Sequence, residues 1–345
     1  MIDFNDNSHK RYNILTGDWI LVSPHRTKRP WQGKEEDVIV EERPSYDPNC
    51  YLCPGNERAG GAVNPDYKEP FAFTNDFAAL KADVPYEKFK DGLLHAESES
   101  GTCRVVCFSP NHSLTLPIME EENIEKVVQL WQKEFKNLGN RDDINYVQIF
   151  ENKGAMMGCS NPHPHGQIWS QRSIPQEIKK KNAHFKEYWD NNKSGLLGDY
   201  LKQELELKER ILVETEYFVA LIPYWAVWPY EAMIAPKTQH RNILSLSNEE
   251  RKDYAKIIKK LTIKYDNLFK VSFPYSAGIH QAPTDGQERE GWHFHMSFYP
   301  PLLRSATVKK FMVGYEMFAM PQRDITAEMA ADTLRNLPDV HYSKG

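Results

Sequence analysis

The feature that most constrains the fold of this chain is an order of predicted elements that occurs twice along its 345 residues. In each half, a pair of strands precedes an amphipathic helix, which is followed by a further strand and then by a strand with alternating histidines. Alternating and β-branched patterns predict strands at 104–108, 145–150, 218–222, 232–235, 276–280 and 293–299. Such a repeat indicates a duplicated unit. We therefore expect an α+β fold with two antiparallel sheets, each with a helix packed on it.

Apolar residues at helical spacing predict one helix in each half and a third in the connection between the halves. The first helix follows the acidic segment 120–122, and the second follows Asn248 and two glutamates. Acidic side chains in a first turn are favourable because they interact with the helix dipole. The connecting helix is expected around 185–201. Because the chain is longer than an ordinary single core, we expect two domains, 1–180 and 181–345.

The composition is that of a soluble globular protein and excludes several classes of function. Apolar residues make up 40% of the chain, and a net charge of -5 provides no general field that attracts nucleic acid or an acidic membrane. No apolar run is long enough to span a bilayer, and the polar N-terminus lacks a signal-peptide core. We therefore expect a cytoplasmic protein with no nucleic-acid or membrane partner. Its five cysteines, an odd number, argue against a disulfide framework.

A basic loop follows a predicted hairpin near the N-terminus. It contains His25, Arg26, Lys28 and Arg29. Such a loop is either a solvated surface segment or an arm that reaches a phosphate. Charge alone favours the solvated segment.

Cys50 and Cys53 form a CxxC pair, and the turn between them can bring both sulfur atoms to one tetrahedral metal ion. The chain has no second CxxC, so other ligands are needed, and His112 and His163 are candidates for a Cys2His2 zinc site. Two buried cysteines beside two ordinary loop histidines explain the spacing equally well. A redox-active pair is disfavoured, because the strand and helix typical of that motif are absent.

The segment 161–167 reads Asn-Pro-His-Pro-His-Gly-Gln and combines several groups suited to phosphate chemistry. In an extended chain, His163, His165 and Gln167 point to the same face. Neutral imidazole is a good nucleophile toward phosphorus and a good leaving group afterwards. An amide can donate to a phosphate oxygen where negative charge develops. A histidine-rich surface turn is the alternative, but three polar groups on one face are unusual for packing. We predict that His165 is a covalent nucleophile on a nucleotide phosphate.

A third cluster contains His280, His293 and His295, the last two on one face of a predicted strand. It is either a second metal site or a relic of the duplication, hydrogen-bonded within the core. The spacing favours neither interpretation.

Several long motifs together resemble those of the galactose-1-phosphate uridylyltransferase family, a transferase branch of the histidine triad superfamily. The resemblance extends nearly from end to end. The segments that carry it are 23–33, 73–77, 150–154, 163–167, 213–216 and 300–317. It implies two histidine-triad-like domains, with a zinc site and the nucleophile in 1–180 and hexose-phosphate contacts in 181–345.

The resemblance also implies a two-step exchange in galactose metabolism, in the Leloir pathway. His165 attacks the α-phosphorus of UDP-glucose and releases glucose 1-phosphate, and the uridylyl-histidine then passes UMP to galactose 1-phosphate. Gln167 matches a glutamine that steadies the phosphoryl group, where hydrolase relatives carry histidine. The backbone carbonyl of His163 is expected to orient the ring of His165.

Substrate contacts and a homodimer with shared active sites follow from the same resemblance. Arg26 and Arg29 match arginines that reach into the site of the partner subunit, which turns the basic loop into a phosphate arm. The positions that match nucleotide contacts are Asn75, Asp76, Asn152, Gly158, Ser160 and Gln167. The positions that match hexose and hexose-phosphate contacts, several of them across the dimer, are Lys310, Phe311, Val313, Tyr315, Glu316 and Gln322.

Zinc is implied because bacterial members of the family hold it with two cysteines and two histidines. Cys50, Cys53, His112 and His163 match all four ligands. We expect this zinc to be structural, because the protein fills every position and leaves none open for water.

A second, iron-type site of the family requires one glutamate and three histidines. His280 and His295 match two of these ligands, but Lys181 and Ser297 stand where the other two are expected. A protonated lysine has no lone pair and repels a cation. We therefore expect no iron-type site, and we do not expect His293 to replace the missing ligands.

Two other functions fit parts of the sequence. A phosphorylase or hydrolase would act on a different sugar nucleotide, but Gln167 and the intact 300–317 motif favour the transferase. A zinc-containing nucleotide-binding protein without catalysis would need no nucleophile at His165.

Overall fold

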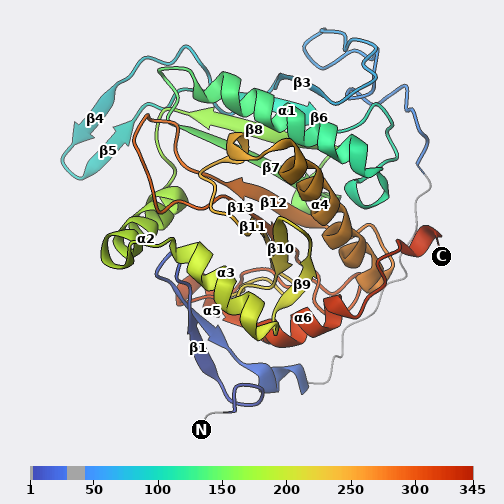
Figure 1. The fold of residues 1–345 in the computed structure, drawn as a ribbon. Helices are drawn as coiled ribbons and strands as arrows, with labels where there is room; N and C mark the ends of the chain where they lie inside the picture. The colour runs from blue at the N-terminus through green and yellow to red at the C-terminus, as the bar shows by residue number, and fades with distance from the viewer. Residues whose placement is uncertain (1–2, 29–42, 345) are drawn as a thin grey trace.

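A nine-stranded antiparallel sheet runs through the computed structural model, which describes residues 3–28 and 43–344 (Figure 1). In spatial order its strands are β3 (Phe71–Thr74), β6 (Gly101–Cys107), β8 (His165–Gln171), β7 (Tyr146–Lys153), β12 (Tyr275–His280), β13 (His295–Tyr299), β11 (Ala232–Pro236), β10 (Phe218–Leu221) and β9 (Ile211–Glu214). Each strand runs antiparallel to its neighbours. The predicted α+β class is confirmed.

The sheet consists of two similar sets of strands that meet where β7 pairs with β12. In the first half, β6, β7 and β8 are arranged as β6-β8-β7, and in the second half β11, β12 and β13 are arranged as β11-β13-β12. The two sheets expected from the sequence are therefore joined edge to edge into one. The pairing satisfies backbone groups that two separate edges would leave open. The prediction of two separate sheets considered each half by itself, so it did not include the hydrogen bonds between β7 and β12.

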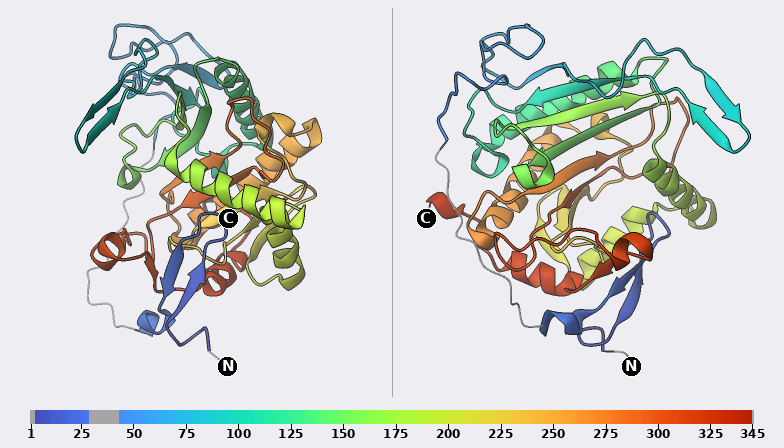
Figure 2. Two further views of the ribbon diagram at one scale, coloured as in Figure 1. Left: turned by 90° about the vertical axis from the view of Figure 1, so that its left-hand side faces the viewer. Right: turned by 180° about the vertical axis from the view of Figure 1, so that it is seen from behind.

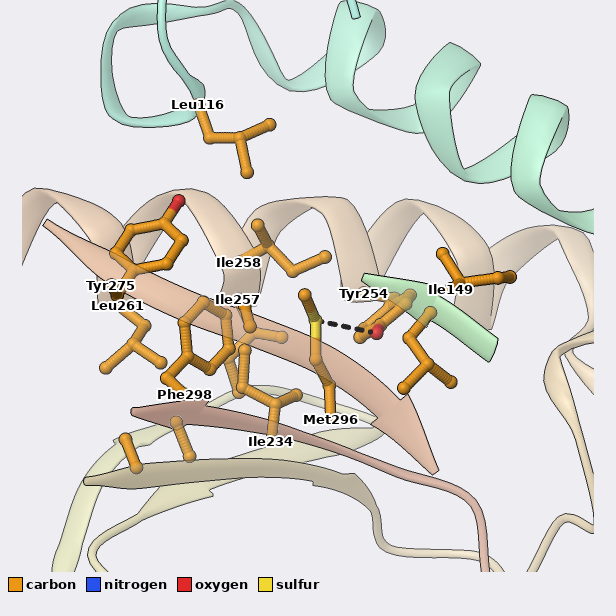
Figure 3. Close-up of a cluster of buried hydrophobic side chains, with 14 of the residues drawn as sticks. Leu116, Ile149, Ile234, Tyr254, Ile257, Ile258, Leu261, Tyr275, Met296 and Phe298 are labelled. Carbon is orange, nitrogen blue, oxygen red and sulfur yellow. Dashed lines mark hydrogen bonds between the residues drawn. The ribbon is translucent and has the colours of Figure 1, made fainter. Parts of the chain in front are cut away.

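Two long helices, α1 (Glu121–Gly139) and α4 (Asn248–Phe269), lie side by side over one face of this sheet (Figure 1). Both were predicted from their apolar spacing. Side chains of α4 pack against the strands in the close-up of Figure 3, where the hydroxyl of Tyr254 donates to the sulfur of Met296 at 3.1 Å. This layer forms the larger of the two main hydrophobic cores.

The other face of the second half is covered by α2 (Gln176–Asn192) and α3 (Leu196–Leu207). The sequence predicted one helix here, but Lys193 adopts a left-handed φ of 56° and ends α2. The second core contains residues of α2, α3, the N-terminal hairpin and the strands of the second half, together with Tyr146 of β7, and no residue of β8. The face of β8 that points away from α1 and α4 lies outside both of these cores, and its residues are half-buried. We call it the open face of β8.

The remaining elements lie around this framework. They are β1 (His9–Tyr12), β2 (Trp19–Val22), β4 (Lys88–Asp91), β5 (Leu94–Glu97), α5 (Tyr315–Phe318), β14 (Gln322–Arg323) and α6 (Ala327–Arg335). The predicted N-terminal hairpin is present as β1 and β2, and β14 joins it in parallel. Figure 2 shows the β4–β5 hairpin projecting from the body of the molecule. None of the described helices combines the length and the apolar character that a membrane span needs.

Candidate active site

His165 is the first residue of β8, and the loop before it fixes the orientation of its ring. The side-chain oxygen of Asn161 accepts a hydrogen bond from the N–H of His163 at 2.9 Å, which tightens this turn. The carbonyl oxygen of His163 lies 2.7 Å from Nδ1 of His165. Because a carbonyl only accepts, Nδ1 carries the proton and Nε2 keeps its lone pair. Burial lowers the pKa of His165, which also favours the neutral ring.

Gly166 follows His165, and no larger residue fits there. A Cβ at this position would lie 2.8 Å from the carbonyl oxygen of Phe150 and 2.9 Å from the ring of Phe108. The strand therefore packs closely on its core side. Its alternation places His165 and Gln167 together on the open face.

Two pockets share His165. The smaller one, of about 300 Å³, is lined by all six positions that match nucleotide contacts: Asn75, Asp76, Asn152, Gly158, Ser160 and Gln167. The larger one, of about 610 Å³, also contains Asn152 and Ser160 and extends to the C-terminal tail. His165 therefore lies at two adjacent spaces.

The larger pocket contains charged residues that the sequence analysis did not single out. Nζ of Lys153 lies 2.8 Å from Asp266, and Nε2 of His341 lies 3.3 Å from the same carboxylate. Burial raises the pKa of Glu151 to about 7, and the hydroxyl of Tyr275 donates to its carboxylate at 3.1 Å. Glu151 and Lys153 lie on β7, within the segment 150–154, whereas Asp266, Tyr275 and His341 come from α4, β12 and the C-terminal tail. Only the fold brings these distant residues together.

Four buried side chains that can bind a metal ion converge beside β8, and their ligand atoms all lie within 4.8 Å of one another: Cys50, Cys53, His112 and His163. The sulfur of Cys53 is 3.6 Å from Nδ1 of each histidine. Zinc bonds of about 2.3 Å to sulfur and about 2.05 Å to nitrogen, at a tetrahedral angle, separate two such atoms by about 3.6 Å. The four residues therefore fit a tetrahedral zinc ion.

His163 connects this metal-binding cluster to His165. Its Nε2 lies 2.8 Å from the carbonyl of Ser109, which places the proton on Nε2 and leaves Nδ1 free to bind a metal. Its own carbonyl accepts from His165. The geometry thus allows both of the roles expected of His163.

Two family models together match almost the whole chain. The model described as "Galactose-1-phosphate uridyl transferase, N-terminal domain" matches residues 1–175, and the corresponding C-terminal domain matches residues 180–345. The chain belongs to the galactose-1-phosphate uridyl transferase family. Enzymes of this family are nucleotidyltransferases.

Relatives in the uridyl transferase family extend over the same length as this chain. A galactose-1-phosphate uridylyltransferase of Haemophilus influenzae is 55% identical over 98% of this chain and 97% of its own length. The galactose-1-phosphate uridylyltransferase of Saccharomyces cerevisiae is 49% identical over 99% of this chain and 97% of its own.

Solved structures with the same fold are more distant in sequence. A uridylyltransferase structure has a TM-score of 0.75 and 23% identity, and it covers 95% of this chain and 97% of its own. An ADP-glucose phosphorylase from Arabidopsis thaliana has a TM-score of 0.76 and 21% identity, covering 96% of this chain and 100% of its own. At these identities the similarity establishes the fold alone.

The residues that the resemblance assigns to the basic arm and to the hexose contacts lie away from His165 of the same chain. Arg26 and the segment 310–322 line neither of the two pockets. Arg26 instead pairs with Asp324 at 2.9 Å, and α5 and the N-terminal hairpin lie at the far end of the molecule from β6 and β8 (Figure 1). Arg29 lies outside the described residues.

The histidines of the second half form a cluster of a different kind. Nζ of Lys181, on α2, lies 2.9 Å from Nε2 of His295, and the rings of His280 and His295 stack at 4.8 Å. His293 points elsewhere, because its Nε2 lies 2.8 Å from the carbonyl of Pro236. Ser297 offers only a hydroxyl. The donors for a four-ligand iron-type site are therefore not present among these residues.

Proposed function

We propose that this protein transfers a uridylyl group between UDP-glucose and galactose 1-phosphate, in the Leloir pathway of galactose metabolism, through a covalent uridylyl-histidine at His165. The observation that carries the proposal is the bond between His163 and His165, which keeps the proton on Nδ1. Nε2 is thus a free nucleophile in a residue that lines the candidate nucleotide pocket. The names of the closely similar relatives support galactose 1-phosphate as a substrate and the uridylyl group as the group transferred.

In the first step, the lone pair of Nε2 forms a bond to the α-phosphorus, and the bond from phosphorus to the bridging oxygen breaks. That oxygen keeps the electron pair and leaves as the phosphate of glucose 1-phosphate. No proton has to move, because Nδ1–H remains on the ring and its bond to the His163 carbonyl stabilises the positive charge. In the second step, a phosphate oxygen of galactose 1-phosphate attacks the same phosphorus and expels neutral imidazole.

The smaller pocket is the proposed site for the uridine diphosphate part of the substrate. Asn75 and Asp76 would contact uridine and ribose, and Asn152, Gly158 and Ser160 would line the path of the phosphates. Gln167 would donate its amide N–H to a phosphoryl oxygen beside His165. Arg58 pairs with Asp76 at 3.6 Å and lies 4.0 Å from the ring of Phe73, so this wall is held in place.

Zinc is the proposed occupant of the cluster formed by Cys50, Cys53, His112 and His163. When bound, the metal would supply a structural crosslink, with no coordination position open for water. The loop that contains Cys50 and Cys53 would then be joined to the loop that carries His163, whose carbonyl orients the nucleophile.

We further propose that the protein acts in the cytoplasm and that each chain has two domains, 1–180 and 181–345. We also propose that it is a homodimer in which each active site contains residues of both chains. In this arrangement the loop with Arg26 and Arg29 and the segment 310–322 complete the site of the second copy. The hexose contacts would be Lys310, Phe311, Val313, Tyr315, Glu316 and Gln322. Val313 and Tyr315 are more than half exposed in the single chain, and Phe318 is 90% exposed, which favours burial against another copy.

Incubation with UDP-glucose alone tests the proposed reaction. We expect one equivalent of glucose 1-phosphate per active site and an acid-labile UMP adduct on His165, identified by mass spectrometry. Continuous release without a second hexose phosphate would indicate a hydrolase and overturn the transferase. His165→Gly should form no adduct, and its rescue by uridine 5′-phosphorimidazolate would exclude a protein that only binds nucleotides.

A further inference from the structure

Gln167 and Trp169 are hydrogen-bonded to each other on the open face of β8. The indole Nε1–H of Trp169 donates to Oε1 of Gln167 at 2.9 Å. An indole N–H can only donate, so the amide atom that faces it is the oxygen. The amide nitrogen of Gln167 is therefore turned away from Trp169, and Gln167 lines the pocket that also contains His165.

The indole is held in place by contacts other than this hydrogen bond. Its ring meets the ring of Phe150 edge to face, with centroids 5.7 Å apart at 78°. Phe150 is also the cross-strand partner of Gln167 on β7. The ring of Trp169 is thus held in place, and its N–H can orient the more flexible side chain of Gln167.

A second amide in the pocket illustrates why the indole matters. The hydroxyl of Ser276 lies 2.7 Å from Oδ1 of Asn152. A hydroxyl can donate or accept, so it would bind either orientation of an amide. Only the Gln167 amide is bonded, among the described contacts of these two side chains, to a group that permits one orientation.

We propose that Trp169 is a positioning residue for uridylyl transfer, because its N–H turns the –NH₂ group of Gln167 toward the phosphoryl group. This proposal rests on the proposed function at His165. An inverted amide would present its oxygen lone pairs to the phosphoryl oxygens and repel their developing negative charge. A donor already oriented before the reaction stabilises that charge without reorganisation.

A double-mutant cycle tests the coupling of the two side chains. The rate of the first step is measured by rapid quench as the burst of glucose 1-phosphate from UDP-glucose. We expect Gln167→Ala to lower this rate by about 100-fold. Trp169→Phe should lower it by roughly five- to tenfold, the effect of one hydrogen bond, with the affinity for UDP-glucose unchanged within about twofold. The double variant should be no slower than Gln167→Ala.

Additive losses would overturn the proposal, as would a full burst rate in Trp169→Phe, because the indole would then act independently of Gln167. Trp189→Phe, on α2, is the matched control and should react at the wild-type rate. Failure of the proposed function is distinguishable, since the wild-type protein would then show no burst.

Gln167→Glu provides a test that leaves Trp169 intact. The carboxylate still accepts from the indole, but its second oxygen replaces the amide nitrogen in the pocket. We expect this variant to be slower than Gln167→Ala by about tenfold, because it adds repulsion to the loss of a donor. A Gln167→Glu variant as fast as Gln167→Ala would contradict the proposed orientation of the amide.

Discussion

β8 and β13 carry the same local arrangement of two histidines, but they differ in what lies over them. Nδ1 of His165 is 2.7 Å from the carbonyl of His163, and Nδ1 of His295 is 2.9 Å from the carbonyl of His293. Both second histidines therefore have a lone pair on Nε2. In β8 this atom belongs to a residue that lines two pockets, whereas in β13 it accepts from Lys181.

The helices between the two halves produce this difference. α2 and α3 cover the sheet face that carries His295, which is fully buried, and leave the face that carries His165 open. Burial lowers the pKa of Lys181 to about 7 and lowers the pKa of His295 as well. The duplicated backbone motif therefore places its second histidine in a pocket only where α2 and α3 do not cover the sheet.

The largest expected difference between the halves is in how much activity depends on His165 and on His295. His165→Ala should lower the rate of uridylyl transfer by at least about 10⁴-fold, because the attacking atom is removed. His295→Ala should keep this rate within a few-fold and mainly lower the free energy of unfolding, because it leaves a buried cavity. Steady-state assays and denaturant unfolding measure both quantities. Comparable losses of activity in the two variants would contradict the proposed difference between His165 and His295.

The residues two positions further along each strand should also differ. Gln167→Ala removes a donor beside the phosphate and should lower kcat by about 100-fold. Ser297→Ala changes a buried hydroxyl away from the pockets and should alter kcat by less than about twofold. Measurements of kcat for both variants test this difference. A large effect of Ser297→Ala would show that the second half also contributes to catalysis.

The two halves should also differ in their metal content. Elemental analysis should find about one zinc per chain, held in the first half, and little or no iron. Cys53→Ser should lose the zinc and lower the melting temperature by roughly 5 °C, because a crosslink of the folded state is removed. Lys181→Met is the control and should leave the zinc content unchanged. Iron in an amount equal to zinc would show that our interpretation of Lys181 and Ser297 is wrong.

The smallest expected effect on activity comes from converting the second half into a metal-binding one. The double variant Lys181→Glu/Ser297→His supplies the glutamate and the histidine that complete a set with His280 and His295. It should bind about one further divalent ion and keep transferase activity within about twofold, since none of these four residues lines the pockets at His165. Binding of the further ion by the wild-type chain would contradict the assignment.

Much of the fold could be predicted because its signals are local. The spacing of apolar residues located α1 and α4, and alternation located the strands around each histidine pair. Cys50, Cys53, His112 and His163 were brought together on motif grounds, and the structure places them within one cluster. The break between α2 and α3 was missed because the apolar pattern continues across Lys193.

The sequence by itself thus determined the α+β class, the repeated order of elements and the two histidine pairs, because each depends on residues that are neighbours in the chain. Only the tertiary structure decided that the two sheets join at β7 and β12, and that Lys153, Asp266 and His341 meet in one pocket. It also decided that His165 lines two pockets whereas His295 is fully buried. The physical reason is that burial and pairing depend on elements far apart in sequence, and α2 excludes solvent from His295 but not from His165.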